Sequence, residues 1–326
     1  MLTFLTALVC VAMAKITPHI FPVELMAPDS GGYIAFAANR TVGYPLFLQL
    51  VHKIFGTHAI VPSIQWSIFG VAAFSLALQI QRKWGMGYGI LAILGTLCNP
   101  EWNKYHSMIL TESLSSSLLL FVLSTLIAYT RNPKARKLAL LSGFIGLGIL
   151  IRPINYTWLA APILFLIIFW SQFKKRSAAY FSALLLPFVC VIFGGMHMYA
   201  QHHGVYKTQS FLGHNLIGKA GVFADPACPT SNPTFVKAMA QKVQAYRTGV
   251  EKISTIQGHY FLSAPFYDQV RFQNQASISR DLGIALTDDE MFSISKELIA
   301  CNPMAFAKDT LINYAALWLL LDFKTP

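Results

Sequence analysis

The sequence predicts an all-α protein, a multi-pass bundle of transmembrane helices with a small extracytoplasmic helical domain. Three observations support this prediction: the composition, the length of the apolar runs and the distribution of basic residues between them. Of the 326 residues, 55% are hydrophobic and 12% are charged, and the mean hydropathy is +0.50. A soluble domain contains roughly 25% charged residues. The composition therefore places the chain among membrane proteins.

The apolar runs have the length needed to cross a bilayer, for which a helix requires ~20 residues. They lie at 2–22, 61–80, 86–98, 114–130, 138–153, 156–172, 178–199 and 304–322. These runs predict about eight spans. Arg152 and Pro153 interrupt the apolar stretch, which we interpret as two helices joined by a tight turn. The first run fits a cleaved signal peptide or a retained helix, and the absence of a basic segment before it favours the helix.

The basic residues orient this bundle. Lys and Arg are concentrated in every second loop, as Arg82 and Lys83, then Arg131, Lys134, Arg136 and Lys137, then Lys174, Lys175 and Arg176. Basic loops remain cytoplasmic because they are hard to translocate. The N-terminus is then cytoplasmic, and Asp29, Glu112 and Arg152 lie on the extracytoplasmic face. These loops also account for much of the net charge of +11, so we expect no nucleic-acid partner.

The chain divides into three predicted parts. Residues 1–200 form the transmembrane core with an extracytoplasmic loop at 23–60, residues 201–303 form an extracytoplasmic domain, and residues 304–326 form a C-terminal transmembrane helix. In the middle part, 232–257 and 284–300 are predicted helices, the second with a capping box from Thr287 to Glu290. Cys228 and Cys301 fall on the oxidising side of this topology, and we expect them to form a disulfide.

The loop at 23–60 contains a further helix. Its residues 46–55 place apolar side chains on one face at helical spacing. Such a helix lies in the membrane interface or enters the protein as a buried re-entrant helix, and the sequence leaves both interpretations open.

Asp29 is the first candidate for chemistry. It follows the first apolar run in a glycine-rich turn. A carboxylate there can accept the proton of a hydroxyl that attacks an electrophile. The alternative is that Asp29 or Ser30 only caps the helix that begins near Tyr33.

Arg152 and Glu112 are the second and third candidates. A guanidinium binds phosphate oxygens through two hydrogen bonds, but an arginine at a helix end also serves as a snorkelling anchor. Glu112 opens an apolar run, where the helix dipole stabilises an acidic residue. A functional carboxylate at this depth would hold an acceptor, a metal ion or a catalytic arginine.

The other polar residues give weaker signals. The histidines lack the spacing of a helical zinc pair, and the chain contains no phosphate-binding glycine loop, dinucleotide fingerprint or hydrolase elbow. We therefore expect no metal site. Lys207, His214 and Lys219 are candidates for contacts with a donor or an acceptor.

Four motifs follow one another in the first 200 residues: Asp29-Ser30-x-x-Tyr33, Gly43-Tyr44-Pro45, Thr111-Glu112-Ser113 and Gly146-Leu147-Gly148-Ile149-Leu150-Ile151-Arg152-Pro153. In this order they resemble the integral-membrane glycosyltransferases of the GT-C superfamily, which includes protein O-mannosyltransferases and the aminoarabinose transferases of lipid A. The resemblance covers about residues 1–200, and each motif alone is short.

The resemblance implies transfer of a sugar from a polyprenyl-phosphate carrier to an extracytoplasmic acceptor (a lipid, glycan or protein), with inversion at the anomeric carbon. Asp29 then matches the catalytic base and Arg152 the arginine that binds the donor phosphate. Glu112 and Tyr33 match supporting positions on the acceptor side. Many relatives carry a second acidic residue where this chain has Ser30, which argues against a divalent metal. The size of the chain suggests a bacterial inner membrane.

A non-catalytic membrane protein is the rival interpretation, as a transporter or flippase for the same lipid or as an assembly subunit. A transporter carries charges inside its spans and broken helices in paired halves. Here the apolar runs are almost free of charge, which favours the enzyme. A short C-terminal part and the missing second acid keep the assembly subunit open.

Overall fold

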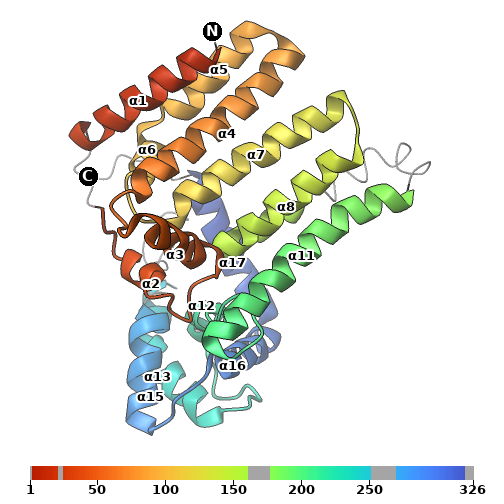
Figure 1. The fold of residues 1–326 in the computed structure, drawn as a ribbon. Helices are drawn as coiled ribbons and strands as arrows, with labels where there is room; N and C mark the ends of the chain where they lie inside the picture. Colours follow the sequence, from red (N-terminus) through yellow and green to blue (C-terminus); the bar gives the residue numbers. More distant parts are fainter. Residues whose placement is uncertain (1, 21–24, 161–176, 251–268, 320–326) are drawn as a thin grey trace. The chain divides into compact units, whose positions relative to one another are not determined.

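The computed structural model describes residues 2–20, 25–160, 177–250 and 269–319 (Figure 1). Within these ranges the chain is helical and contains no strand. The all-α prediction is confirmed to this extent. The chain forms two compact units, residues 1–209 and residues 210–326, which are described separately below.

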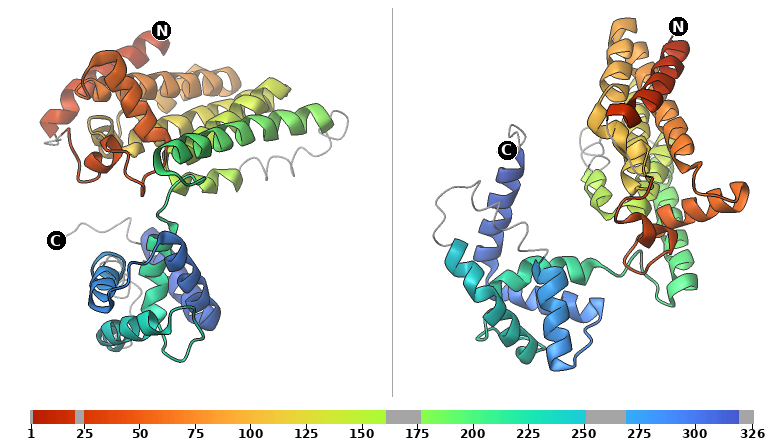
Figure 2. Two further views of the ribbon diagram at one scale, coloured as in Figure 1. Left: turned by 60° about the horizontal axis from the view of Figure 1, so that its bottom comes forward. Right: turned by 90° about the vertical axis from the view of Figure 1, so that its left-hand side faces the viewer.

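The first unit is built from long helices that lie side by side in Figures 1 and 2. Its elements are α1 (Leu2–Ile20), α2 (Ser30–Ile34), α3 (Gly43–Phe55), α4 (Val61–Trp84), α5 (Met86–Leu97), α6 (Pro100–His106), α7 (Thr111–Arg131), α8 (Ala135–Ile151), the 3₁₀ helix η1 (Pro153–Leu159) and α11 (Ser177–His203). Helix α4 packs against α1, α5 and α7, then α7 against α8, and α8 against α11.

Small and apolar residues allow these helices to approach one another. The buried residues Phe69, Ala73 and Ala77 of α4 pack with Ile93 and Leu97 of α5. Small side chains at a helix interface let the backbones come close, as in membrane proteins. The many serines of α7 cost little because their hydroxyls find partners: Ser116 and Ser117 donate to carbonyls one turn earlier, and the others bond to side chains of neighbouring elements.

Three of the described helices are long and apolar enough to cross a membrane, namely α4, α7 and residues Ala178–His203 of α11. Helices α1 and α5 are apolar but shorter. The membrane prediction is confirmed at this coarser level. The count of about eight spans remains a prediction. Most of the predicted span at 156–172 lies outside the described residues.

Helix α8 ends where the sequence predicts a turn. Arg152 is extended, with φ −150° and ψ 126°, and η1 begins at Pro153. Proline disfavours the α conformation of the residue before it, which explains why the helix ends here. The described part beyond the turn is a 3₁₀ helix over Pro153–Leu159, so the expected α-helix does not begin at 156.

The boundary between the units differs from the predicted one. Helix α11 continues to His203, so a division after residue 200 falls inside a helix, and the first unit extends to residue 209. The predicted boundary lies where the apolar run ends. Residues 200–203 contain neither glycine nor proline, so the helix continues past this point. The C-terminal helix α17 (Pro303–Leu319) groups with the second unit.

The second unit is a small helical domain with its own core. It contains α12 (Leu212–Ala220), the 3₁₀ helix η2 (Gly221–Phe223), α13 (Pro233–Val250), the π-helix η3 (Gln269–Asn274), α15 (Gln275–Leu282), α16 (Asp288–Cys301) and α17. Phe235, Met239, Met291 and Ile294 are fully or almost fully buried in its core.

Two sequence features of this unit are present in the structure. Cys228 and Cys301 form a disulfide, with their Cα atoms 5.9 Å apart. Thr287 and Glu290 form the capping box of α16, each side chain bonding to the backbone of the other residue. The cap satisfies two of the N–H groups that a helix start leaves without partners.

Candidate functional site

The loop before α2 is fixed to the segment that precedes α7. Ser30 is fully buried, and its hydroxyl accepts a hydrogen bond from the Ala27 amide and donates one to the Ile109 carbonyl, both at 2.8 Å. The Ile109 amide in turn donates to the Leu25 carbonyl at 3.0 Å. Ser30 therefore has a structural role, and it sets the position of Asp29.

Asp29 forms an ion pair with a residue that the sequence did not single out. Nη2 of Arg40 lies 2.7 Å from Oδ1 of Asp29. The Asp29 side chain is 58% exposed and that of Arg40 is 19% exposed. Asp29 makes no side-chain capping bond to α2, so the alternative role as a helix cap is not realised.

Arg40 is held tightly in this loop. Its guanidinium stacks 4.6 Å from the centre of the Tyr33 ring and donates a 3.4 Å hydrogen bond to the Tyr33 hydroxyl. Burial lowers the pKa of Arg40, but the hydrogen bond to Asp29 and the charges around it outweigh burial, and the net pKa is raised. A Cβ at Gly32 would lie 2.9 Å from Nε of Arg40, so the glycine makes room for the guanidinium.

Glu112 and Arg152 form the second ion pair. Nη1 of Arg152 lies 3.0 Å from Oε1 of Glu112, and the side chains are 41% and 26% exposed respectively. Glu112 is in the first turn of α7, and Arg152 ends the adjacent helix α8. Each charge complements the dipole of its own helix, which favours this arrangement independently of the pair.

A cavity of about 290 Å³ opens beside this pair. Its lining is mostly polar or aromatic and consists of Tyr105, Glu112, Ser115, Ser116, Leu119, Arg152, Ile154, Asn155, Thr157 and Trp158. Asn155 is fixed by hydrogen bonds from Nδ2 to the Gly148 carbonyl at 2.8 Å and to Ser115 Oγ at 2.9 Å. A cavity with one ion pair and several hydroxyl and amide groups suits a small polar molecule with an anionic group.

A chain of polar contacts connects the two ion pairs. The Tyr33 hydroxyl lies 3.5 Å from Thr111 Oγ1, and Thr111 Oγ1 donates to Glu112 Oε2 at 3.2 Å. The order is therefore Asp29, Arg40, Tyr33, Thr111, Glu112 and Arg152. Asp29 does not line the cavity, and it reaches the Glu112–Arg152 pair through these intervening side chains.

Tyr44 and Gln65 are held in place by hydrogen bonds close to Tyr33. Tyr44 is fully buried and donates a 2.7 Å hydrogen bond to Gln65 Oε1. Burial raises the pKa of Tyr44, and the charges of Tyr33 and Glu112 raise it further, so its hydroxyl stays protonated. Gln65 also donates to the Met108 carbonyl at 2.8 Å.

His106 is a core residue rather than a ligand. It is fully buried, its ring centre lies 3.9 Å from that of Phe69, and Nδ1 lies 2.8 Å from Ser113 Oγ. Burial lowers the pKa of His106 to about 3, so the ring is neutral at physiological pH. The described residues contain no group of three or more side chains suited to hold a metal ion.

The weaker candidates lie on other elements. His214 and Lys219 lie on α12 in the second unit, where the His214 amide donates to Asp288 and Lys219 lies over the Phe306 ring. Burial lowers the pKa of Lys219, while the charge of Asp309 opposes this shift. Lys207 follows α11 at the end of the first unit.

In the described residues the chain is therefore a helical protein with three membrane-length helices and two linked ion pairs. No family model, curated protein or solved structure matches the chain.

Proposed function

We propose that the protein is a membrane glycosyltransferase that moves a sugar from a polyprenyl-phosphate donor to an extracytoplasmic lipid, glycan or protein. The observation that carries this proposal is the Glu112–Arg152 pair at the edge of a small cavity, connected through Thr111, Tyr33 and Arg40 to Asp29. The bundle would cross the membrane about eight times. Its location would be a bacterial inner membrane, with the ion pairs on the outer side.

Arg152 would bind the phosphate of the donor. Its side chain is 41% exposed, so it can meet an anion while Glu112 holds it from the other side. A planar guanidinium matches two phosphate oxygens at once. The hydroxyl groups of Ser116 and Thr157 would bind the hydroxyl groups of the sugar.

Asp29 would act as the base at the other end of the polar chain. Arg40 binds its Oδ1 and keeps the carboxylate oriented, which leaves Oδ2 for the acceptor hydroxyl. This step requires the sugar to reach from the phosphate on Arg152 toward Asp29, beyond the cavity. The acceptor oxygen would then attack the anomeric carbon and pass its proton to Asp29, while the bond from that carbon to the phosphate oxygen breaks. The electron pair of that bond remains on the phosphate, where Arg152 stabilises the charge.

A non-catalytic role is the second candidate, and one observation favours it. Asp29 is already paired with Arg40 and does not line the cavity beside Arg152. A flippase or assembly subunit would use Arg152 to bind the same lipid without transferring its sugar.

Incubation of the purified protein with radiolabelled polyprenyl-phosphate sugars distinguishes the two roles. We expect one donor of the panel to lose its label to a membrane-extract acceptor. Movement of the intact donor across a vesicle membrane, with the label retained, would instead identify a flippase.

A further inference from the structure

The loop that carries Arg40 is shaped by local contacts, and it is also attached to the end of α8. Thr41 follows Arg40 directly and is 3% exposed. Its Oγ1 donates a 2.7 Å hydrogen bond to the carbonyl of Ile151, the residue before Arg152. The last carbonyls of a helix have no partner within the helix, so this bond also completes the end of α8. One buried hydrogen bond thus connects the neighbour of Arg40 with the neighbour of Arg152.

The loop and the end of α8 are in main-chain contact beside this bond. A Cβ at Gly43 would lie 2.8 Å from the Leu150 carbonyl oxygen and 3.1 Å from the Ile151 amide nitrogen. A larger residue at this position would push the two backbones apart. Val42, the residue before Gly43, is fully buried in a cluster with Leu150 and Tyr199. The contact therefore fixes how far the loop lies from the end of α8.

Helix α11 holds the same loop through Tyr199. The Tyr199 side chain is fully buried, and its hydroxyl donates a 2.5 Å hydrogen bond to the Ala38 carbonyl. Its ring packs edge-on against that of Phe36, with the ring centres 6.2 Å apart. Phe36 has a φ of 48°, in the left-handed region that residues other than glycine seldom occupy. Such a conformation persists only where the surroundings fix it, so the loop is held in one arrangement.

The side-chain route between the two ion pairs is weaker than these attachments. Its link from Tyr33 to Thr111 is 3.5 Å long, which is longer than an ordinary hydrogen bond. The bonds that Thr41 and Tyr199 donate are both shorter. The position of one guanidinium group relative to the other therefore depends mainly on these two bonds.

We infer that Thr41 and Tyr199 are positioning residues for sugar transfer, which hold the Asp29–Arg40 pair in a fixed place relative to Arg152. This inference rests on the proposed function, because transfer needs the base and the donor phosphate in one arrangement. Neither Thr41 nor Tyr199 lines the cavity beside Arg152, so neither would contact the donor there. Loss of either hydroxyl should therefore slow the reaction without weakening donor binding.

The first test is Thr41→Val, which removes the hydroxyl and keeps the branched shape of the side chain. We expect kcat for transfer from the radiolabelled donor to fall by about tenfold, since a misplacement of ~1 Å costs up to about 10²-fold, while KM for the donor stays unchanged. Thr41→Ser keeps the hydroxyl and should retain most of the wild-type rate.

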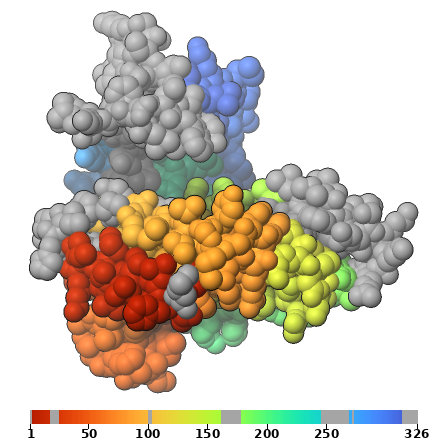
Figure 3. Space-filling view, turned by 90° about the horizontal axis from the view of Figure 1, so that it is seen from above, coloured from red at the N-terminus to blue at the C-terminus, as the bar shows by residue number. Residues whose placement is uncertain are grey.

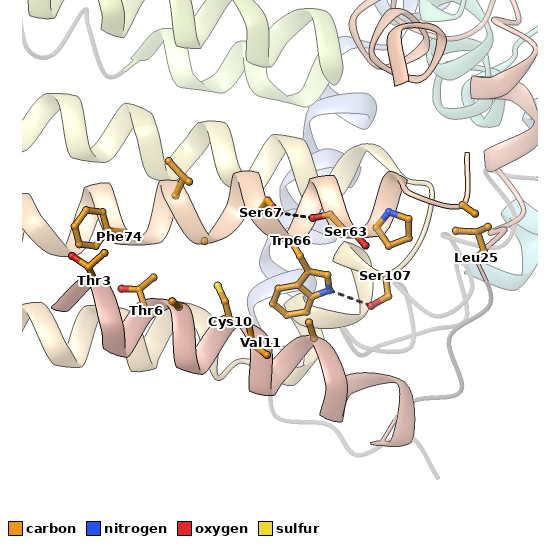
Figure 4. Close-up of a pocket in the computed structure, with 16 residues that line it drawn as sticks. Thr3, Thr6, Cys10, Val11, Leu25, Ser63, Trp66, Ser67, Phe74 and Ser107 are labelled. Atoms are coloured by element: carbon orange, nitrogen blue, oxygen red, sulfur yellow. Dashed lines mark hydrogen bonds between the residues drawn. The ribbon is translucent and has the colours of Figure 1, made fainter. Parts of the chain in front are cut away.

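Thr6→Val is the matched control. Thr6 is 5% exposed, and its Oγ1 donates a 2.9 Å hydrogen bond to the Leu2 carbonyl. It lies on α1, which is coloured red at the surface of the first unit in Figure 3. Figure 4 shows Thr6 beside a groove of about 800 Å³ between α1 and α4, and Thr6 does not line the cavity beside Arg152. The control loses an equally buried hydroxyl on another element, so we expect wild-type values of kcat and KM.

Tyr199→Phe tests the same loop from α11. The variant loses only the hydrogen bond to the Ala38 carbonyl, and we expect a severalfold lower kcat with an unchanged KM. It replaces Thr41→Val if that variant does not fold. Wild-type kcat in the folded variants would overturn the inference, as would a Thr41→Ser variant as slow as Thr41→Val. Equal losses of kcat and of polyprenyl-phosphate binding would also overturn it, because the substitution would then disturb the donor site.

Hydrogen exchange measures the attachment of the loop without turnover. We expect the amides of residues 36–43 to exchange faster in Thr41→Val than in the wild type, and those of Thr6→Val to match the wild type. Absence of sugar transfer by the wild type would remove the proposed function, and with it the role in transfer. The exchange rates would still decide whether Thr41 holds the loop, and equal rates in Thr41→Val and the wild type would show that it does not.

Discussion

The two ion pairs of the first unit are built in different ways. Glu112 and Arg152 lie at the ends of neighbouring helices, and each is favoured by the dipole of its own helix. Asp29 and Arg40 lie in a loop, where Tyr33, Gly32 and Ser30 hold them in place. The first pair depends on helix packing and borders a cavity, whereas the second depends on local contacts and is open at Asp29. This difference suits a division between binding the donor and activating the acceptor.

Substitution of Asp29 should have the largest effect on transfer. We expect Asp29→Asn to lower the rate by about 10²- to 10⁴-fold, because the amide cannot accept the acceptor's proton. Asp281→Asn is the control, since Asp281 lies in the second unit, 66% exposed, and 3.9 Å from Lys242. Normal turnover of Asp29→Asn would remove this residue from the mechanism.

Substitution of Arg152 should have the second-largest effect on transfer. Arg152→Ala should lower transfer by about 10²- to 10³-fold, because the leaving phosphate loses a cation. Arg136→Ala removes an exposed arginine at the other end of the same helix and should leave the rate unchanged. Equal initial rates of transfer by Arg152→Ala and Arg136→Ala would show that Arg152 does not contribute to the reaction.

The loop pair can be disturbed without removing a charge. In Gly32→Ala the new Cβ displaces Arg40 and misplaces Asp29. A misplacement of ~1 Å costs up to about 10²-fold, and we expect a loss of about tenfold. Gly31→Ala adds the same atom where nothing lies within 4 Å, so its rate should equal that of the wild type. Equal rates for the two alanine variants would show that the position of Arg40 does not matter.

The smallest effect should be on stability. Glu112→Gln should change the free energy of unfolding by less than about 1 kcal/mol, because both partners are partly exposed and solvent screens the pair. Denaturation in urea measures this change. A loss of several kcal/mol would show that the pair is a structural element rather than a site.

The sequence predicts the helix-end pair better than the loop pair, for a physical reason. Apolar runs locate helices, so charges at their ends, such as Glu112 and Arg152, can be placed on one face of the bundle. Arg40 lies in a loop eleven residues after Asp29, and no periodicity relates the two. Tyr44 belongs to a predicted motif, but its buried hydrogen bond to Gln65 is not predicted, because the two residues are distant in the sequence.

The ends of helices and units are likewise predictable only where a local sequence signal marks them. The start of α7 at Thr111 and the end of α8 at Ile151 follow from local signals. The division after residue 209 depends on packing between helices, which composition does not record. The helix predicted at 156 begins instead as a 3₁₀ helix at Pro153.

The most direct test is the binding of radiolabelled polyprenyl phosphate to purified protein. It asks whether the Glu112–Arg152 pair binds the donor while the Asp29–Arg40 pair activates the acceptor. Wild-type protein and Asp29→Asn should bind it equally well, Arg152→Ala should bind it weakly, and only the wild type should transfer sugar from the glycosylated form. Tight binding by Arg152→Ala, or loss of binding in Asp29→Asn, would contradict the account.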